Sequence, residues 1–199
     1  MKPAFILLIF VTLAAGCSYL HNPMRRETRR LVTGKVVDTV SYVYDLPYPK
    51  GKRYLKIQGY FSHFTHKRRA AIDFKMPIGS TVCAAREGTV VRLKSDSHNG
   101  GIAKGKRQLA NFIVIQHADG SRAGYWHLMH DGILVAIGDS VQKGQPIARS
   151  GNTGYTYLPH LHFIVWGQNR EGGFTQIPTR FHTSKGARYL RGFRRFKNP

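Results

Sequence analysis

The stretch Pro159-His160-Leu161-His162-Phe163-Ile164-Val165-Trp166 is the most informative part of the sequence for the fold, because it places two histidines in an apolar, β-prone run. Such a run predicts a strand, whose successive side chains point to opposite faces. His160 and His162 are therefore expected on one face, with Leu161 and Phe163 in a core on the other. Two imidazoles side by side commonly form half of a zinc site. The alternative is a pair of strand histidines partly exposed at a sheet edge.

The rest of the chain consists of short β-prone runs separated by turn residues. Strands are expected at 54–59, 70–74, 111–116 and 123–128, and no segment shows a long apolar period of 3.6 residues. Frequent short strands with turn signals predict an all-β fold, in which antiparallel sheets form a sandwich or barrel-like domain with an open groove for the histidines. Arg86-Glu87-Gly88 separates two apolar runs and predicts a hairpin.

The N-terminus has the pattern of a secretory signal, with an apolar run from Ala4 to Ala15 that is too short to span a bilayer. The small residues before Cys17 resemble a bacterial lipobox, although Ala14 stands where leucine is usual. We therefore expect a signal peptide at 1–16 and a lipidated Cys17 that anchors the chain to a membrane. The anchored chain is expected in the cell envelope, at the outer membrane or the periplasmic face. An ordinary cleaved signal is the alternative, and either way the domain works outside the cytoplasm.

Three further segments complete the predicted organisation. Residues 17–34 carry the lipidated N-terminus and a basic tether, residues 35–180 form a β-rich domain, and residues 181–199 form a basic tail with interleaved aromatic residues. With Cys17 lipidated, Cys83 is left unpaired and behaves as a small buried hydrophobe.

The formal net charge of +21 indicates polyanionic surroundings, such as nucleic acid, anionic lipid or an acidic wall polymer. An exported chain has little access to nucleic acid, so a nucleic-acid partner is not expected. The oligomeric state is not predicted.

Three further positions could complete a metal site with the histidine pair. Asp73 is a lone carboxylate among apolar residues, which is costly unless it is paired or metal-bound. His66 or His63 precedes it, and His127 lies on another predicted strand. Asp73 could instead pair with an arginine, of which the candidates are Arg68, Arg69 and Arg86, and His127 could be a core histidine.

These motifs occur in an order that resembles the lysostaphin-type zinc endopeptidases, which cut bacterial peptidoglycan. The resemblance covers residues 58–166, and its most specific part is Gly151-Asn152-Thr153-Gly154 followed by Pro159-His160-Leu161-His162-Phe163.

The resemblance implies that His66, Asp73 and His162 hold Zn²⁺ and that His160 and His127 are catalytic. This sequence departs from the commonest pattern, because His66 lies seven residues before Asp73 rather than four. His63, ten residues before Asp73, therefore stays open as the first ligand. Two imidazoles and one carboxylate would leave a fourth zinc position for water.

The leading hypothesis is a lipid-anchored zinc endopeptidase that hydrolyses the peptide cross-links of peptidoglycan. The alternative is a catalytically silent envelope scaffold or an activator of another wall hydrolase. His117 is expected to be structural, and no site role is expected for His21, His98, His130 or His182.

Overall fold

The structure is a computed structural model, and it describes residues 23–38, 42–168 and 172–199 of the chain. The chain divides into two units, Met1–Asp38 and Thr39–Pro199. The predicted signal peptide and Cys17 lie outside the described residues. None of the helices in the described part of the chain is long and apolar enough to span a bilayer.

The first unit contains one described helix, α2 (Pro23–Val32), within the segment expected to be a basic tether. Arg29 and Arg30 occupy its last turn, where positive charge interacts favourably with the helix dipole. The Thr33 hydroxyl donates to the carbonyl oxygen of Arg29 at the end of this helix. The helix was not predicted, because it is short and strongly basic and its composition resembles that of a polar tether.

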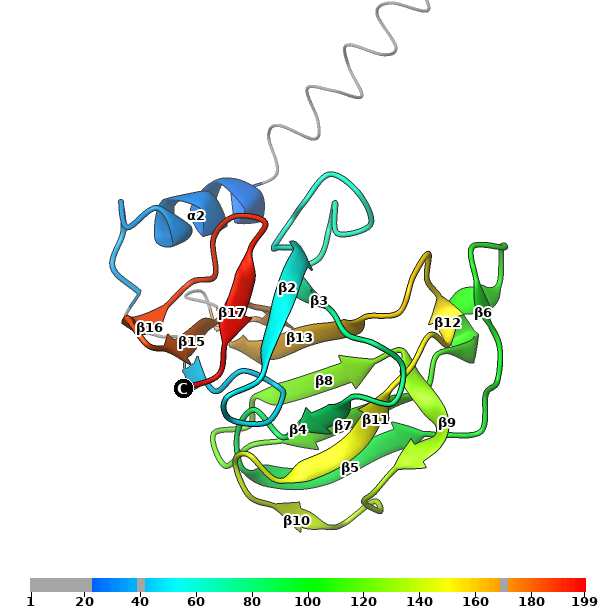
Figure 1. The fold of residues 1–199 in the computed structure, drawn as a ribbon. Helices are drawn as coiled ribbons and strands as arrows, with labels where there is room; N and C mark the ends of the chain where they lie inside the picture. The colour runs from blue at the N-terminus through cyan, green and yellow to red at the C-terminus, as the bar shows by residue number, and fades with distance from the viewer. Residues whose placement is uncertain (1–22, 39–41, 169–171) are drawn as a thin grey trace, which may run out of the picture. The chain divides into compact units, whose positions relative to one another are not determined.

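The second unit is built on a large antiparallel sheet (Figure 1). Within the described residues it contains nine strands, in the order β10-β5-β7-β8-β13-β3-β2-β17, with β14 paired to β13. The bounds are β2 Arg53–Gln58, β3 Ala71–Lys75, β5 Gly88–Lys94, β7 Phe112–Gln116, β8 Arg122–Trp126, β10 Ser140–Val141, β13 Leu161–Gln168, β14 Phe174–Gln176 and β17 Arg195–Lys197.

Smaller sheets accompany the large one. One has the order β4-β11-β9, another β1-β15-β16, and β12 pairs with β6. The bounds are β1 Val43–Tyr44, β4 Thr81–Cys83, β6 Gly100–Gly101, β9 Leu128–Ile133, β11 Pro146–Ser150, β12 Gly154–Tyr155, β15 Arg180–Thr183 and β16 Gly186–Arg188, with a 3₁₀ helix η1 at Lys106–Leu109. Among the described pairs, β1–β15 and β12–β6 are parallel. The predicted all-β class is therefore confirmed.

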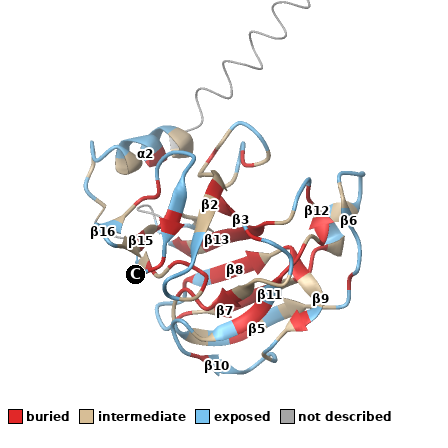
Figure 2. Cartoon of the chain, viewed as in Figure 1, coloured by how far each residue is buried: buried red, intermediate tan, exposed pale blue. Residues whose placement is uncertain are grey.

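The core lies on one face of the large sheet, and Figure 2 shows the buried residues along its central strands. Phe74 of β3 and Phe163 of β13 are at most 2% exposed, and both contact the ring of Phe181. Burying an aromatic side chain of this size contributes about 2–3 kcal/mol. Leu161 and Phe163 face this core as expected, which leaves His162 on the opposite face of the sheet.

The prediction of a hairpin at residues 86–88 is wrong. β4 pairs with β11 and β5 pairs with β7 and β10, so the two runs belong to different sheets. The chain crosses over because Ala84 N donates to the carbonyl oxygen of Gln145 and Ala85 N donates to the hydroxyl of Tyr125. A short connection between two apolar runs fits such a crossover as well as it fits a hairpin.

The segment expected to be a basic tail is part of the folded domain. β15 begins at Arg180 and so spans the predicted boundary at 180/181, and β17 pairs with β2 as an end strand of the large sheet. Phe181 is fully buried and Phe196 is 9% exposed. These aromatic residues therefore alternate with basic ones because one face of each strand is buried.

Candidate active site

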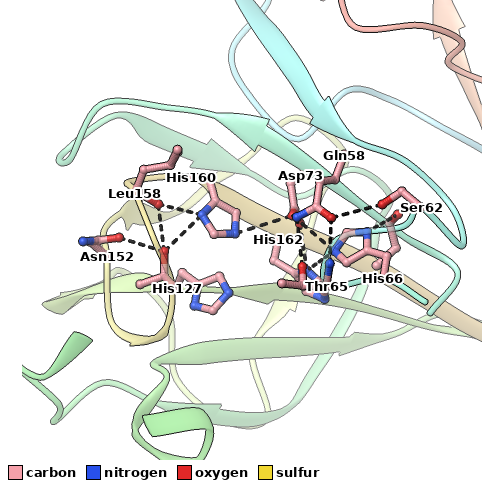
Figure 3. A network of polar contacts seen from close by, with 12 residues as sticks. Gln58, Ser62, Thr65, His66, Asp73, His127, Asn152, Leu158, His160 and His162 are labelled. Atoms are coloured by element: carbon pink, nitrogen blue, oxygen red, sulfur yellow. Dashed lines mark hydrogen bonds and ion pairs between the residues drawn. The ribbon is translucent and has the colours of Figure 1, made fainter. Parts of the chain in front are cut away.

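Asp73 and His162 occupy opposing positions on the adjacent strands β3 and β13. Asp73 Oδ1 lies 2.8 Å from His162 Nδ1, and the two residues are 1% and 6% exposed. Two regular strands fix this contact, because the register of the pair is set by the buried residues on the other face. Figure 3 shows the polar network that surrounds the pair.

His66 reaches the pair from the connection between β2 and β3. Its Nε2 lies 3.1 Å from Asp73 Oδ2 and 3.2 Å from His162 Nδ1. The residue is 1% exposed, and its Nδ1 lies 3.0 Å from the carbonyl oxygen of Ala71 and 3.2 Å from that of Gly59. These carbonyl oxygens can only accept, so His66 Nδ1 donates to them and its Nε2 is the ring nitrogen that faces Asp73 and His162.

His127 and His160 are fixed in the same way, each by a backbone carbonyl. His127 Nδ1 donates to the oxygen of Thr153 over 2.6 Å, and His160 Nδ1 donates to the oxygen of Leu158 over 2.7 Å. His160 Nε2 lies 3.7 Å from Asp73 Oδ2, and the rings of His127 and His160 are 4.6 Å apart between centroids. Both imidazoles therefore keep Nε2 unprotonated when neutral.

The arrangement around Asp73 fits a cation. One ligand atom from each of His66, Asp73 and His162 lies within 4.8 Å of the others. When the His66 ring is neutral, the lone pair of its Nε2 faces a carboxylate oxygen of Asp73, an arrangement that a cation between the two atoms would stabilise. Nitrogen and carboxylate donors in this number match the ligand set of catalytic zinc sites.

The protonation preferences of the site agree with this interpretation. Burial alone would raise the pKa of the Asp73 carboxyl, but the imidazoles of His162 and His66 hold it well below its usual range. Burial lowers the pKa of His162 to about 4, against the opposing effect of Asp73. Asp73 is therefore anionic and His162 neutral at neutral pH, which are the forms that bind a metal.

His127 has an unusual backbone conformation. It lies between β8 and β9 with a φ of 65°, in the left-handed region that costs a residue other than glycine about 1 kcal/mol or more. Burial, with the nearby His160 and His162, lowers its pKa to about 3. The imidazole is therefore neutral at neutral pH, and with its Nδ1 proton donated to Thr153 its Nε2 presents a lone pair at the edge of this cluster.

The structure thus brings together all five residues selected from the sequence: His66, Asp73, His127, His160 and His162. Their individual roles remain predictions. His63, the alternative first ligand, is exposed and is not part of the cluster of possible metal ligands, which consists of His66, Asp73 and His162. The possible pairing of Asp73 with an arginine is not observed among the described residues, and Arg86 pairs instead with Asp119.

Gln58 is a member of the site that was not predicted. Its Nε2 donates to Asp73 Oδ2 over 2.8 Å and to Thr65 Oγ1 over 2.9 Å. Its Oε1 accepts from the Ser62 hydroxyl and from Thr65 N. Gln58 thus joins Asp73 to the loop that carries His66. A glutamine at a strand end carries no sequence signal that would have revealed this.

The cluster opens into a groove of about 700 Å³. Asp73, His127, His160 and His162 line it, together with the indole rings of Trp126 and Trp166. The groove is large enough for several residues of an extended peptide, and its side walls are largely apolar.

Comparison with known proteins identifies related sequences. A model of peptidase family M23 matches residues 67–172. This range includes Asp73, His127, His160 and His162, whereas His66 lies one residue before it.

Curated relatives include the peptidoglycan DD-endopeptidase ShyA of Vibrio cholerae, which is 40% identical over 108 residues, and the glycyl-glycine endopeptidase ALE-1 of Staphylococcus capitis, which is 34% identical over 116 residues. The matches cover 53% and 58% of this chain but only 22% and 29% of those relatives. Among solved structures, lysostaphin from Staphylococcus simulans aligns with 68% of this chain and 47% of its own, at 30% identity and a TM-score of 0.47.

Proposed function

Because the chain belongs to peptidase family M23, we propose that it is a zinc-dependent endopeptidase that hydrolyses peptide cross-links of bacterial peptidoglycan. The observation that carries the proposal is the convergence of a buried aspartate and four imidazoles beside an open groove, which Asp73 and three of the imidazoles line. ShyA and ALE-1 are both endopeptidases, which supports the same reaction class.

His66, Asp73 and His162 would hold the metal through His66 Nε2, a carboxylate oxygen of Asp73 and His162 Nδ1. When bound, zinc would act as a Lewis acid and lower the pKa of a water molecule to about 7. Gln58 and the carbonyl oxygens of Gly59 and Ala71 hold Asp73 and His66 in the orientation that this requires.

His127 and His160 would move the protons of the reaction. Each has its Nδ1 proton committed to a backbone carbonyl, so Nε2 is the atom that accepts a proton from the attacking water and returns it to the leaving amine. When protonated, either Nε2 can also donate a hydrogen bond to the oxyanion that develops on the scissile carbonyl. A histidine base is needed because the His-Glu-x-x-His motif, which supplies a glutamate base, is absent from the sequence.

The proposal includes attachment to a bacterial membrane through acylated Cys17, with export directed by residues 1–16. The apolar run and the small residues before Cys17 support this part of the proposal. An anchor of this kind would hold the enzyme at the edge of the wall, and the basic residues of 18–34 would favour an anionic surface.

Digestion of purified peptidoglycan tests the function. We expect the protein to release peptides with a new amino terminus, identified by mass spectrometry, to lose this activity on chelation and to regain it with zinc. A purified chain that contains about one zinc but leaves the peptides intact would contradict the proposed reaction. A metal-free chain that binds wall material without cutting it would support an envelope scaffold instead.

A further inference from the structure

A second hollow, with a strongly basic lining, adjoins the groove. It has a volume of about 420 Å³, and Lys67, Arg68, Arg69 and Arg107 line it together with the rings of Tyr155 and Tyr157. No carboxylate is among its described lining residues. We call this hollow the basic recess. The four basic side chains give the lining a positive charge that no carboxylate of the described lining offsets, and an anionic ligand would neutralise it.

The basic recess is continuous with the groove, because Arg69, Arg107, Tyr155 and Tyr157 line both hollows. A peptide lying across the metal cluster could therefore place one of its side chains or its terminus in the recess. The recess itself contains none of the five residues of the candidate active site. It is thus placed to select a substrate rather than to take part in bond cleavage.

Arg69 and Arg107 are held in place by different parts of the fold. Arg69 ends the loop that carries His66, where its backbone N donates to the His66 oxygen and its own oxygen accepts from Phe61 N. Arg107 belongs to η1, and its guanidinium lies 5.5 Å from the ring centroid of Tyr155. Neither guanidinium forms an ion pair with a carboxylate of the described residues within 4.0 Å.

The two arginines also act on each other. Burial lowers the pKa of Arg69 and the positive charge of Arg107 lowers it further, while the carboxylate of Asp73 acts in the opposite direction. The fold therefore keeps two like charges close together in a partly desolvated place, which costs free energy without a ligand. Two guanidinium groups are well suited to a carboxylate, since each can donate two parallel hydrogen bonds to it.

Aromatic rings close the side of the recess. The rings of Phe64 and Tyr157 lie 5.4 Å apart between centroids, although the two residues are 67% and 54% exposed. Phe64 belongs to the connection between β2 and β3, and Tyr157 to the connection between β12 and β13. The contact between the two rings therefore joins two segments that are distant in the sequence. A bound peptide would gain apolar contact with these rings while its charged group meets the arginines.

We propose that the basic recess is a subsite for a carboxylate of the substrate peptide, bound by Arg69 and Arg107. This inference rests on the proposed function and narrows its substrate class to peptidoglycan peptides that keep a free carboxylate near the cleaved bond. The same peptide with that group converted to a carboxamide has the same shape but no charge. It should therefore be a poorer substrate.

The test uses a pair of synthetic cross-linked peptidoglycan peptides that differ only in free carboxylate against carboxamide. We expect the zinc-loaded wild-type protein to cleave the carboxylate form with a kcat/KM about tenfold higher or more, mainly through a lower KM. Arg69→Gln and Arg107→Gln should each lower kcat/KM for the carboxylate form more than for the carboxamide form, and so reduce this preference. Lys104→Gln removes the same charge from an exposed position outside the recess and should keep the preference.

The outcomes separate this inference from the function on which it rests. Equal cleavage of both peptides by the wild-type protein would overturn the subsite and leave the endopeptidase intact. Equal loss of both activities in Arg107→Gln, with wild-type zinc content and thermal midpoint, would also overturn the subsite, because it would indicate a structural role. Failure of the zinc-loaded wild-type protein to cleave either peptide, or purified peptidoglycan, would overturn the proposed function and the subsite together.

Discussion

Asp73 and His162 face each other directly across β3 and β13, with Asp73 Oδ1 2.8 Å from His162 Nδ1. Both side chains project from regular strands whose opposite faces are filled by Phe74, Leu161 and Phe163. The geometry of this pair is therefore fixed by packing of the core. His66 depends on a loop, and so its position depends on the hydrogen bonds that hold that loop.

The first prediction separates a ligand from a catalytic residue. His162→Ala removes one of three ligand atoms, so we expect the purified protein to lose stoichiometric zinc and activity together. His160→Ala should keep about one zinc per chain while turnover falls about 10²–10⁴-fold, as for the loss of a general acid or base. Metal analysis and peptidoglycan digestion measure the two effects. Equal zinc loss in both variants would show that this division of roles is wrong.

The second prediction concerns Gln58, which links Asp73 to Thr65 of the His66 loop. Gln58→Leu keeps the size of the side chain but removes all four of its side-chain hydrogen bonds, so zinc affinity should fall about 10–100-fold. Competition with a chelator of known affinity measures the change. Gln116→Leu is the matched control, since Gln116 bonds only to the side chain of exposed Arg122 among the side-chain contacts described. Wild-type zinc affinity in Gln58→Leu would mean that the loop is held without this residue.

The alternation of β13 could be predicted from the sequence, because a strand period of two needs only local information. His66, Asp73 and His127 were candidates from their local settings, and the resemblance joined them into one site. The resemblance to lysostaphin-type peptidases is confirmed by the match to family M23 and by lysostaphin itself, which is 35% identical over 116 residues. The same match places the chain in a peptidase family, and the ligand set of the cluster fits a metal site, as predicted.

Other features depend on distant contacts that no local pattern shows. Gln58 reaches Asp73 only because β2 pairs with β3, and the crossover after Ala85 depends on Tyr125 and Gln145. The pairing of β17 with β2 joins residues about 140 positions apart in the chain, which made the C-terminal strand look like an appended tail. Sequence periodicity carries no information on such pairings.

The third prediction concerns Gly154, next to the carbonyl that holds His127. Its φ is 82°, and a Cβ there would lie 2.4 Å from the Cβ of Ala110 and 2.8 Å from its Cα. Gly154→Ala should therefore combine backbone strain with overpacking and lower the free energy of unfolding by about 3 kcal/mol. Movement of Thr153 would also displace His127 and reduce turnover.

Gly186→Ala is the matched control for this substitution. Gly186 has nearly the same φ, 80°, but a Cβ there meets nothing within 4 Å. Only the backbone cost of roughly 1–2 kcal/mol should remain, and activity should be unchanged. Urea unfolding and peptide cleavage measure both variants. Equal effects of the two substitutions would contradict a special packing role for Gly154.

The fourth prediction concerns Cys17. If this residue is acylated, Cys17→Ser should be released in soluble form when cells are fractionated, while the wild-type chain stays with the membranes. Each buried methylene of an acyl chain contributes about 0.8 kcal/mol, so the loss of the chains should detach the protein almost completely. Ser18→Ala, at the neighbouring position, is the control and should remain attached. Continued membrane attachment of Cys17→Ser would contradict lipidation.

The last prediction concerns pH and a histidine outside the site. His117 is 3% exposed, its Nδ1 donates to the Glu87 oxygen over 2.6 Å, and its Nε2 has no hydrogen-bond partner among the described residues. Burial lowers the pKa of His117 below its usual 6.5. Below that pH the unfolded chain takes up a proton that the folded chain does not, so this contribution to stability is present above pH 6.5 and declines as the pH falls.

His117→Asn retains a donor for the Glu87 carbonyl but cannot titrate. We therefore expect the difference in unfolding free energy between about pH 7.5 and about pH 5 to be smaller in this variant than in the wild-type protein. His98→Asn, at an exposed position, should keep the wild-type difference. Urea titrations at both pH values measure the three proteins. An unchanged difference in His117→Asn would mean that His117 takes up its proton in the folded chain as readily as in the unfolded one.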